Sequence, residues 1–330
     1  MMLVSRLLSQ ALVAFTIEVD NAFEARMPHR TTRGPARGAE GPWLVSLAMW
    51  SNFLRYVPAG GVAQADVGDL AALTNLPGLQ RWGYVRVAGG MVHPTRHGLR
   101  ADALFRPLCA EAEDRWERQF GDGLRRVLEP LASPLLPRYL PVAGPTRHTG
   151  PPAGRRADHE RADLAALLSR VLLEITGEYE AEARLPLGVA ANALRVLGGG
   201  PLRPREVPLR AGIAKEAAAQ SVAMLLRHGL ADADGKGPSA LVWLTARGEV
   251  AARNYHARMA RVEARRPAEA LTNALMPVVE GAAEAVRPPE AGWRNHPPYR
   301  AQTAAFLADP LGALPHHPLV THRGGFPDGS

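Results

Sequence analysis

The amino-acid sequence predicts a mainly α-helical chain with small β-hairpins, in which one arrangement of elements occurs twice. Apolar residues recur at helical spacing through most of the chain, and short motifs return in the same order in its second half. A repeat of this length indicates a duplicated domain, because solenoid units run only about 20–50 residues. The recurring motifs are Leu7-Leu8-Ser9 and Leu167-Leu168-Ser169, Asn52-x-Leu54-Arg55 and Asn192-x-Leu194-Arg195, Arg81-x-Gly83 and Arg227-x-Gly229, and Thr95-x-x-Gly98 and Thr245-x-x-Gly248.

Length and composition are consistent with two folded domains. A chain of 330 residues has room for both, together with a linker and a tail, and its hydrophobic fraction of 46% excludes wholesale disorder. Cys109 is the single cysteine, which excludes a disulfide framework and a multi-cysteine zinc site and suits a reducing cytoplasm. We find neither a signal peptide nor a run of apolar residues long enough for a membrane span. We therefore expect a cytoplasmic protein without a membrane partner.

The first domain is predicted over residues 1–140. Apolar spacing indicates helices over 4–27 and 42–57, and short helices lead to Trp82-Gly83. A β-hairpin is expected around Ala88-Gly89-Gly90, because glycines in a short turn between apolar runs are typical of hairpins. A long helix from Thr95 to about Phe120 follows.

Residues 141–160 are rich in Pro, Gly, Arg and Thr and are predicted to be the linker. The second domain is expected over 161–282, with the same order of elements and a hairpin around Gly235-Lys236-Gly237-Pro238. Residues 283–330 form a Pro/His/Gly-rich tail. We expect this tail to pack across the body through Trp293, Tyr299, Phe306 and Leu307.

Each domain is thus expected to follow the order helix, helix, short helix, helix, hairpin, long helix. This is the order of a winged helix-turn-helix, so the fold class we predict is mainly α with small β-hairpin wings, as tandem winged helix-turn-helix domains. In such a domain a tight turn holds one helix clear of the surface, where it can enter the major groove of DNA. The net charge of +7 and the sequence pI near 10.1 permit a nucleic-acid partner.

The second copy resembles the MarR family of bacterial transcriptional regulators over roughly residues 163–280. The resemblance lies in Leu225-Leu226-Arg227-His228-Gly229-Leu230, in Asp232-x-Asp234, and in Leu241-x-x-Leu244-Thr245-x-x-Gly248 after the hairpin turn. Residues 5–136 resemble the same family less closely. The resemblance implies a helix before the wing that reads double-stranded DNA. It also implies a small-molecule effector near the flanking helices that weakens DNA binding.

Mapped onto the second copy, this resemblance assigns the reading role to residues 214–228. Lys215 is expected to meet a phosphate, and Gln220 an adenine edge or a phosphate. The only two lysines of the chain, Lys215 and Lys236, fall on the predicted reading helix and wing tip. Against this reading, Glu216 and several alanines share the exposed face, so a purely structural helix is the alternative. The predicted DNA contacts of this copy are Lys215, Gln220, Ser221, Arg227, Lys236, Arg203 and Arg205.

The first copy departs further from the family pattern. Its corresponding helix is shorter and contains Pro77 and Gly78, so it would project little surface into a groove. Arg81 and Arg86 are expected to touch phosphates, contacts that position a protein without reading sequence. The alternative is a pseudo-subunit that supplies dimer-like contacts to the second copy.

Other candidate sites are weaker. Trp43, Trp50, Trp82 and Tyr84 lie near junctions where such folds hold small ligands, and an ordinary aromatic core is the alternative. Cys109 is expected to pack as a small hydrophobe. The tail histidines His296, His316, His317 and His322 have no fixed ligand geometry, so we expect no metal and no cofactor. No P-loop, G-x-G-x-x-G, H-E-x-x-H or Ser/His/Asp ordering is present, and we expect no enzyme.

The resulting hypothesis is a sequence-specific, DNA-binding transcriptional regulator under the control of a small ligand. The alternative is a winged-helix scaffold that binds no DNA and instead senses a small molecule or binds a protein partner. The sequence leaves open whether the chain acts alone on an asymmetric site or forms a homodimer.

Overall fold

The computed structural model describes residues 2–30, 41–70, 76–138, 161–235, 237, 240–297 and 299–319. Within these ranges the chain is mainly helical with two small antiparallel sheets, which confirms the fold class at that level. Below, half 1 denotes the described residues up to 138, half 2 those of 161–282, and the tail those of 283–319. None of the described helices has both the length and the apolar composition that a membrane crossing requires.

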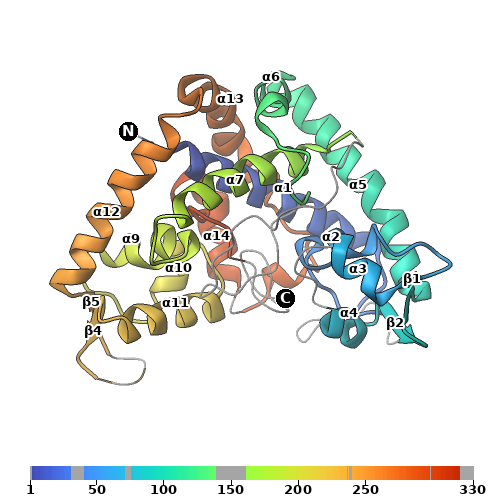
Figure 1. Cartoon of the computed structure of the whole chain (residues 1–330), viewed down its shortest axis with the longest axis horizontal. Helices are drawn as coiled ribbons and strands as arrows, with labels where there is room; N and C mark the ends of the chain where they lie inside the picture. Colours follow the sequence, from blue (N-terminus) through green and yellow to red (C-terminus); the bar gives the residue numbers. More distant parts are fainter. Residues whose placement is uncertain are drawn as a thin grey trace.

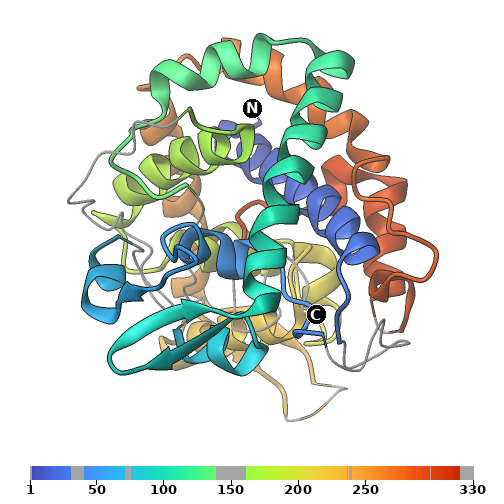
Figure 2. The same cartoon turned by 90° about the vertical axis from the view of Figure 1, so that its right-hand side faces the viewer.

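Half 1 is built around a helix at the centre of the molecule (Figure 1). This helix, α1 (Val4–Arg26), is buried along nearly its whole length, including the polar residues Ser9, Gln10 and Thr16. It packs against the long outer helix α5 (Arg96–Phe120), which crosses it in Figure 2. The other elements of half 1 are α2 (Leu47–Leu54), β1 (Val62–Ala63), α3 (Gln64–Leu70), α4 (Leu76–Trp82), β2 (Val85–Ala88), β3 (Met91–Pro94) and α6 (Gly123–Leu128).

Half 2 repeats this order of elements. It begins with α7 (Leu164–Glu180), which packs against α1 at the centre. One continuous helical stretch follows, in which a π-helical turn (Ala190–Leu194) lies between α8 (Leu187–Val189) and α9 (Arg195–Leu197). The remaining elements are α10 (Val207–Ala211), α11 (Lys215–Arg227), β4 (Ala231–Ala233), β5 (Val242–Leu244), the long helix α12 (Ala246–Glu263) and α13 (Ala268–Glu280).

The second helix of half 1 begins later than predicted. Residues 42–46 are not helical, because their backbone is paired elsewhere: the Trp43 amide donates to the Trp82 carbonyl at 2.9 Å. Ser46 then starts α2 as its cap, with the side-chain oxygen accepting from the Ala48 amide. The prediction of a helix over 42–57 was therefore wrong at its N-terminal end, and α2 also ends earlier than predicted, at Leu54.

The repeated Thr-x-x-Gly motif caps the long helix of each half. The Thr95 hydroxyl accepts from the Gly98 amide at 3.0 Å at the start of α5, and the Thr245 hydroxyl accepts from the Gly248 amide at 3.2 Å at the start of α12. Side-chain caps of this kind satisfy an amide that has no partner within the helix. The recurrence of the motif is thus explained by a recurring local structure.

The same threonines connect each long helix to the glycine before the hairpin. Their hydroxyls donate to the carbonyls of Gly83 at 2.7 Å and Gly229 at 2.8 Å. Both glycines have positive φ, 87° and 64°, a conformation that side chains other than glycine's rarely adopt. The Arg-x-Gly repeat therefore marks a chain reversal between the helix and the hairpin in both halves.

The halves also exchange helix caps across their interface. Glu263, at the end of α12, accepts from the amides of Val4 and Ser5, both at 2.9 Å, at the start of α1. In the opposite direction Glu113 on α5 accepts from the Leu164 amide at 3.1 Å, at the start of α7. Reciprocal contacts of this kind characterise a two-fold dimer interface. The two halves are related to one another like the subunits of a homodimer.

The tail lies against both halves. It contains a short 3₁₀ turn (Trp293–Asn295), α14 (Arg300–Ala308) and α15 (Pro310–Ala313). On α1, Gln10 donates to the carbonyls of Leu311 at 2.8 Å and Leu314 at 2.9 Å. On the π-helical turn of half 2, Asn192 donates to the His317 carbonyl at 2.8 Å. The tail therefore links the first helix of half 1 to the second helical stretch of half 2.

Candidate nucleic-acid interface

Each half carries a small sheet and two helices, and both sets lie at the same end of the molecule (Figure 1 and Figure 2). We call residues 62–94 lobe 1 and residues 202–244 lobe 2. Lobe 1 has a three-stranded antiparallel sheet in the order β1-β3-β2. Lobe 2 has the pair β4-β5, extended by an isolated bridge between Leu202 and Val242. The sequence predicted the hairpins of both lobes but not the additional short strand β1 or the bridge.

In lobe 2 a tight turn connects α10 to α11. Gly212 ends α10 with a φ of 66°, and Ile213, which follows, is fully buried. The inner side of α11 is buried through Ala217, Ala218 and Leu225, so the helix is fixed on one face. The opposite face is left to solvent.

The exposed face of α11 carries polar and small side chains. Lys215 and Gln220 are both exposed, as the sequence predicts, and Arg227 is exposed at the other end of the helix. The exposed side chains of this helix are Lys215, Glu216, Ala219, Gln220, Ala223, Leu226 and Arg227.

Two of the predicted DNA contacts of lobe 2, Ser221 and Lys236, are not among these exposed side chains. Ser221 is fully buried, and its hydroxyl donates to the Ala217 carbonyl at 2.7 Å, so it does not lie on the exposed face. The prediction for Ser221 was wrong because this position, four residues after Ala217 and four before Leu225, belongs to the buried stripe. Lys236 at the predicted wing tip lies outside the described residues.

Further basic residues flank α10 and α11. Arg203 and Arg205 are exposed just before α10. Asp232 and Asp234 are exposed on the hairpin, and the Asp234 carboxylate accepts from the Leu241 amide at 2.6 Å, which ties the two strands together. The basic surface of lobe 2 is therefore formed by the helices, whereas the described base of its hairpin is acidic.

Lobe 1 offers a smaller exposed helical surface. On α4 the buried residues are Gly78, Leu79 and Trp82, and Gln80 and Arg81 are exposed. The exposed cations around the helix are Arg81, Arg86 on β2, and Arg96 and Arg100 on α5. Arg81 and Arg86 are thus exposed on lobe 1, together with the polar side chains of Gln64, Asp66 and Gln80.

The four aromatic residues considered as a ligand pocket belong to the core of half 1. Trp50, Trp82 and Tyr84 are buried, and the rings of Trp50 and Tyr84 stack with centroids 5.8 Å apart. The Tyr84 hydroxyl donates to the carbonyl of the half-buried Trp43 at 3.0 Å. Burial also raises the pKa of the Tyr84 phenol well above its usual value. Their packing supports the alternative of an aromatic core and not a pocket.

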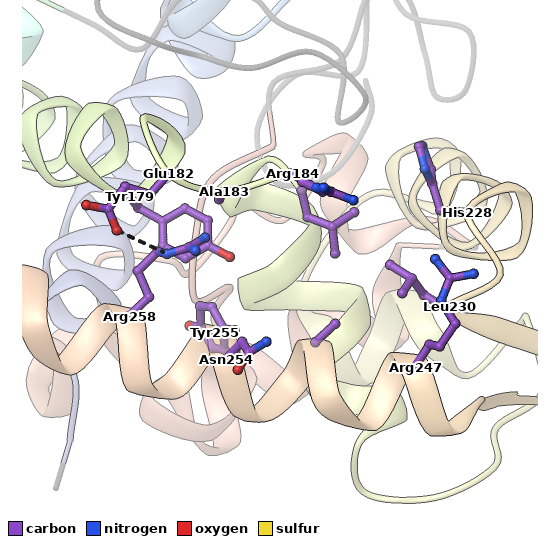
Figure 3. Close-up of a pocket in the computed structure, with 12 residues that line it drawn as sticks. Tyr179, Glu182, Ala183, Arg184, His228, Leu230, Arg247, Asn254, Tyr255 and Arg258 are labelled. Carbon is purple, nitrogen blue, oxygen red and sulfur yellow. Dashed lines mark ion pairs between the residues drawn. The ribbon is translucent and has the colours of Figure 1, made fainter.

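A pocket does occur in half 2, between α7, the segment that follows it, the end of α11 and the face of α12 (Figure 3). Its volume is about 350 Å³. Tyr179 and Tyr255 form part of its wall, and burial raises the pKa of Tyr179 to about 12. It is lined by Tyr179, Glu182, Ala183, Arg184, Leu185, His228, Leu230, Arg247, Ala251, Asn254, Tyr255 and Arg258.

The charges of this pocket are mainly positive. Arg184, Arg247 and Arg258 line it together with one carboxylate, Glu182, whose Oε2 lies 3.9 Å from Arg258 Nε. Arg258 Nε is buried and makes no hydrogen bond, and its guanidinium lies over the Tyr179 ring at 5.4 Å. None of these pocket residues was predicted from the sequence as a site residue. The helical spacing of Asn254, Tyr255 and Arg258 was the available signal, but their partners come from distant segments.

The tail histidines considered as metal ligands are His296, His316 and His317 within the described residues, and His322 outside them. His317 is buried, and its ring nitrogens face the Thr176 hydroxyl at 3.1 Å and the Pro318 carbonyl at 2.9 Å. Within the described ranges no three His, Cys, Asp or Glu side chains converge as metal ligands would.

Comparison of the chain with protein-family models, with curated proteins and with solved structures finds no match.

Proposed function

We propose that the protein is a sequence-specific, double-stranded DNA-binding transcriptional regulator with two winged helix-turn-helix lobes. The observation that carries this proposal is the exposed face of α11, which follows a tight turn and precedes a hairpin at the end of the molecule shared by both lobes. A helix held in this way can enter the major groove, which is wide enough to admit it.

The side chains on this face have suitable chemistry. Lys215 carries a point charge for a phosphate, and the Gln220 amide can both donate to and accept from the edge of an adenine. Arg203 and Arg205 extend the positive surface beyond α11. Glu216 lies within the same face and would repel phosphates, so we place the end of the helix that carries it toward the bases.

The test is binding of the purified protein to pooled genomic fragments across a salt series. A Lys215→Ala/Gln220→Ala variant is compared with Arg261→Ala, which removes a positive charge from the last turn of α12, far along that helix from lobe 2. We expect a selective fraction that survives rising salt, is lost in the double variant and persists in the control. Absence of binding even at low salt, where phosphate contacts are strongest, would refute the proposal.

A second candidate function is favoured by the half 2 pocket. Its three arginines and its buried Arg258 Nε without a hydrogen bond fit a small organic anion. The scaffold would then sense a carboxylate or phosphate, either as the effector of the regulator or without any DNA partner.

The pocket is tested by the shift in melting temperature with small carboxylates and phosphates. We expect stabilisation in the parent chain that is lost in Arg258→Met, because ligands that bind only the folded state stabilise it. Arg253→Met, an exposed position on the same helix that does not line the pocket, is the control. Equal shifts in both variants would argue against the site.

A further inference from the structure

The surfaces that join the two halves are occupied inside a single chain. α1 packs against α7, and α13 packs against both α1 and α6. The carboxylates of Glu113 and Glu263 add the reciprocal caps. In an isologous interface the same surface of each subunit pairs with its counterpart, and no further subunit can bind there once both are paired. Here both paired surfaces belong to one chain, so they are not free to bind a second chain.

The two lobes differ at the positions that would read bases. Lys215 precedes Gly229 by the same number of residues as Asp69 precedes Gly83. Lys215 is the first residue of α11, whereas Asp69 belongs to α3, the helix before α4. Within the described residues of α4 there is therefore no counterpart of Lys215.

A proline in α4 supports this difference. Pro77 is the second described residue of α4 and stands where lobe 2 has Ala223, in the middle of α11. Proline is tolerated in the first turn of a helix but not in its interior, because it lacks an amide hydrogen and clashes with the preceding turn. A proline at this point therefore disfavours a helix that, like α11, extends two further turns toward the N-terminus.

The exposed groups of lobe 1 are suited to phosphates. Arg81, Arg86 and Arg96 are exposed around α4 and its hairpin. Gln80 is the exposed amide of α4, but it lies near the C-terminal end of the helix. In helix-turn-helix proteins the N-terminal residues of the reading helix contact base edges. Gln80 is therefore poorly placed for the role that we assign to Gln220.

From these observations we infer that one chain binds an asymmetric duplex site. Lobe 2 reads base pairs on one side, and lobe 1 holds only the sugar-phosphate backbone on the other. This inference rests on the proposed function and specifies its partner. The partner is a DNA duplex bound by a single chain, in which binding depends on the sequence of the half that contacts lobe 2 and not on that of the other half.

The experiment uses the full chain and a fragment selected from pooled genomic DNA. The half-site nearer lobe 2 is located by a cleavage reagent attached through an Ala219→Cys substitution, in a Cys109→Ser background. Each half of the duplex is then scrambled separately, and the side that faces lobe 1 is also removed. Sedimentation gives the number of chains per duplex.

We expect one chain per duplex. Scrambling the lobe 2 side should lower the affinity at least ten-fold, since one good base contact discriminates by about that factor. Scrambling the lobe 1 side should change affinity less than two-fold. Removing that side should weaken binding and lower the slope of log K against log salt, because phosphate contacts are lost.

Matched variants separate the two roles. Gln220→Ala should abolish the preference for the selected sequence, and Gln80→Ala, the exposed amide of lobe 1, should leave it unchanged. Arg81→Ala/Arg86→Ala should weaken binding to all sequences alike and lower the salt slope by about 2, or about 0.9 for each phosphate.

Two chains per duplex, or equal losses on scrambling either side, would overturn the inference and leave DNA binding itself intact. Loss of sequence preference in Gln80→Ala would do the same. No binding of the parent chain at low salt would instead remove the proposed function. Circular dichroism of each variant serves as the check that a loss of DNA binding does not come from a loss of folding.

Discussion

Glu113 and Glu263 perform the same task in opposite directions: each carboxylate accepts backbone amides at the start of the first helix of the other half. The first four amides of a helix have no partner within it, and the positive end of the helix dipole favours an anion. The two side chains therefore satisfy buried backbone groups and join the halves at the same time.

We expect Glu263→Gln to lower the free energy of unfolding by about 1–2 kcal/mol, because the charge that faces two amides is lost while its shape is kept. Glu113→Gln should destabilise the protein at least as much, because the Glu113 carboxylate caps α7 and also forms an ion pair with Arg125. Urea unfolding followed by circular dichroism measures both. Glu280→Gln, which removes an exposed carboxylate without a cap contact, should change stability by less than about 0.5 kcal/mol. Equal effects of all three would show that the caps contribute nothing.

Gly248→Ala should be strongly destabilising, by about 3 kcal/mol. A Cβ at Gly248 would overlap the carbonyl oxygen of Leu230, a backbone atom that cannot rotate away. Gly98→Ala should behave alike in half 1, where the overlap is with the Tyr84 carbonyl. The control is Gly235→Ala, where no atom lies within 4 Å of the added carbon. Thermal unfolding distinguishes them, and a Gly248→Ala protein as stable as the control would contradict the observed close approach.

We expect Asn192→Ala to weaken the packing of the tail against half 2. The Asn192 side chain is fully buried, donates to the carbonyls of Gly188 at 3.0 Å and His317 at 2.8 Å, and accepts from the His316 amide at 3.1 Å. Leaving these groups without partners should cost about 3 kcal/mol. Hydrogen exchange should increase at residues 314–319. Asn254→Ala, exposed on α12, serves as the control, and unchanged exchange in the Asn192 variant would count against this role of the side chain.

We expect the free energy of unfolding to fall at acid pH, because the unfolded chain takes up a proton at His317. Burial lowers the pKa of His317 to about 4, whereas an unfolded histidine has a pKa near 6.5. Between these values the unfolded chain binds more protons than the folded one, so this contribution is complete above about pH 6.5 and is lost as the pH falls toward 4. From pH 6.5 to 5 the loss is about 2 kcal/mol.

The measurement is urea unfolding of the parent chain and of His317→Gln at pH 7 and pH 5. The variant cannot take up the proton, so the stability gap between the two proteins should shrink at pH 5. Asn254→Ala, an exposed substitution that leaves every histidine in place, should leave the pH dependence unchanged. A gap that is constant with pH would show that His317 does not titrate in this range.

Local motifs allowed much of the fold to be predicted from the sequence. Thr-x-x-Gly and Arg-x-Gly specify a cap and a chain reversal that involve neighbouring residues, so their repetition indicated a repeated structure. The exposure of Lys215 and Gln220 followed from helical spacing in the same way. These features depend on residues close together in the chain.

The remainder depended on distant contacts. Nothing near Glu263 in the sequence shows that its partners are Val4 and Ser5. The half 2 pocket combines side chains of α7, α11 and α12, and the late start of α2 depends on a bond from Trp43 to Trp82. Ser221 is different, since its place in the buried stripe could have been found from the spacing of Ala217 and Leu225.

The connection of two related halves in one chain has an evolutionary consequence. In a homodimer every substitution appears in both subunits, so a change that improves one contact is imposed on the other. Here α4 and α11 could diverge separately, because each is encoded once. Covalent connection also holds the second half at a high effective concentration, so that assembly does not depend on expression level. Joining the two halves in one chain thus leaves one half free to change while the other preserves the architecture.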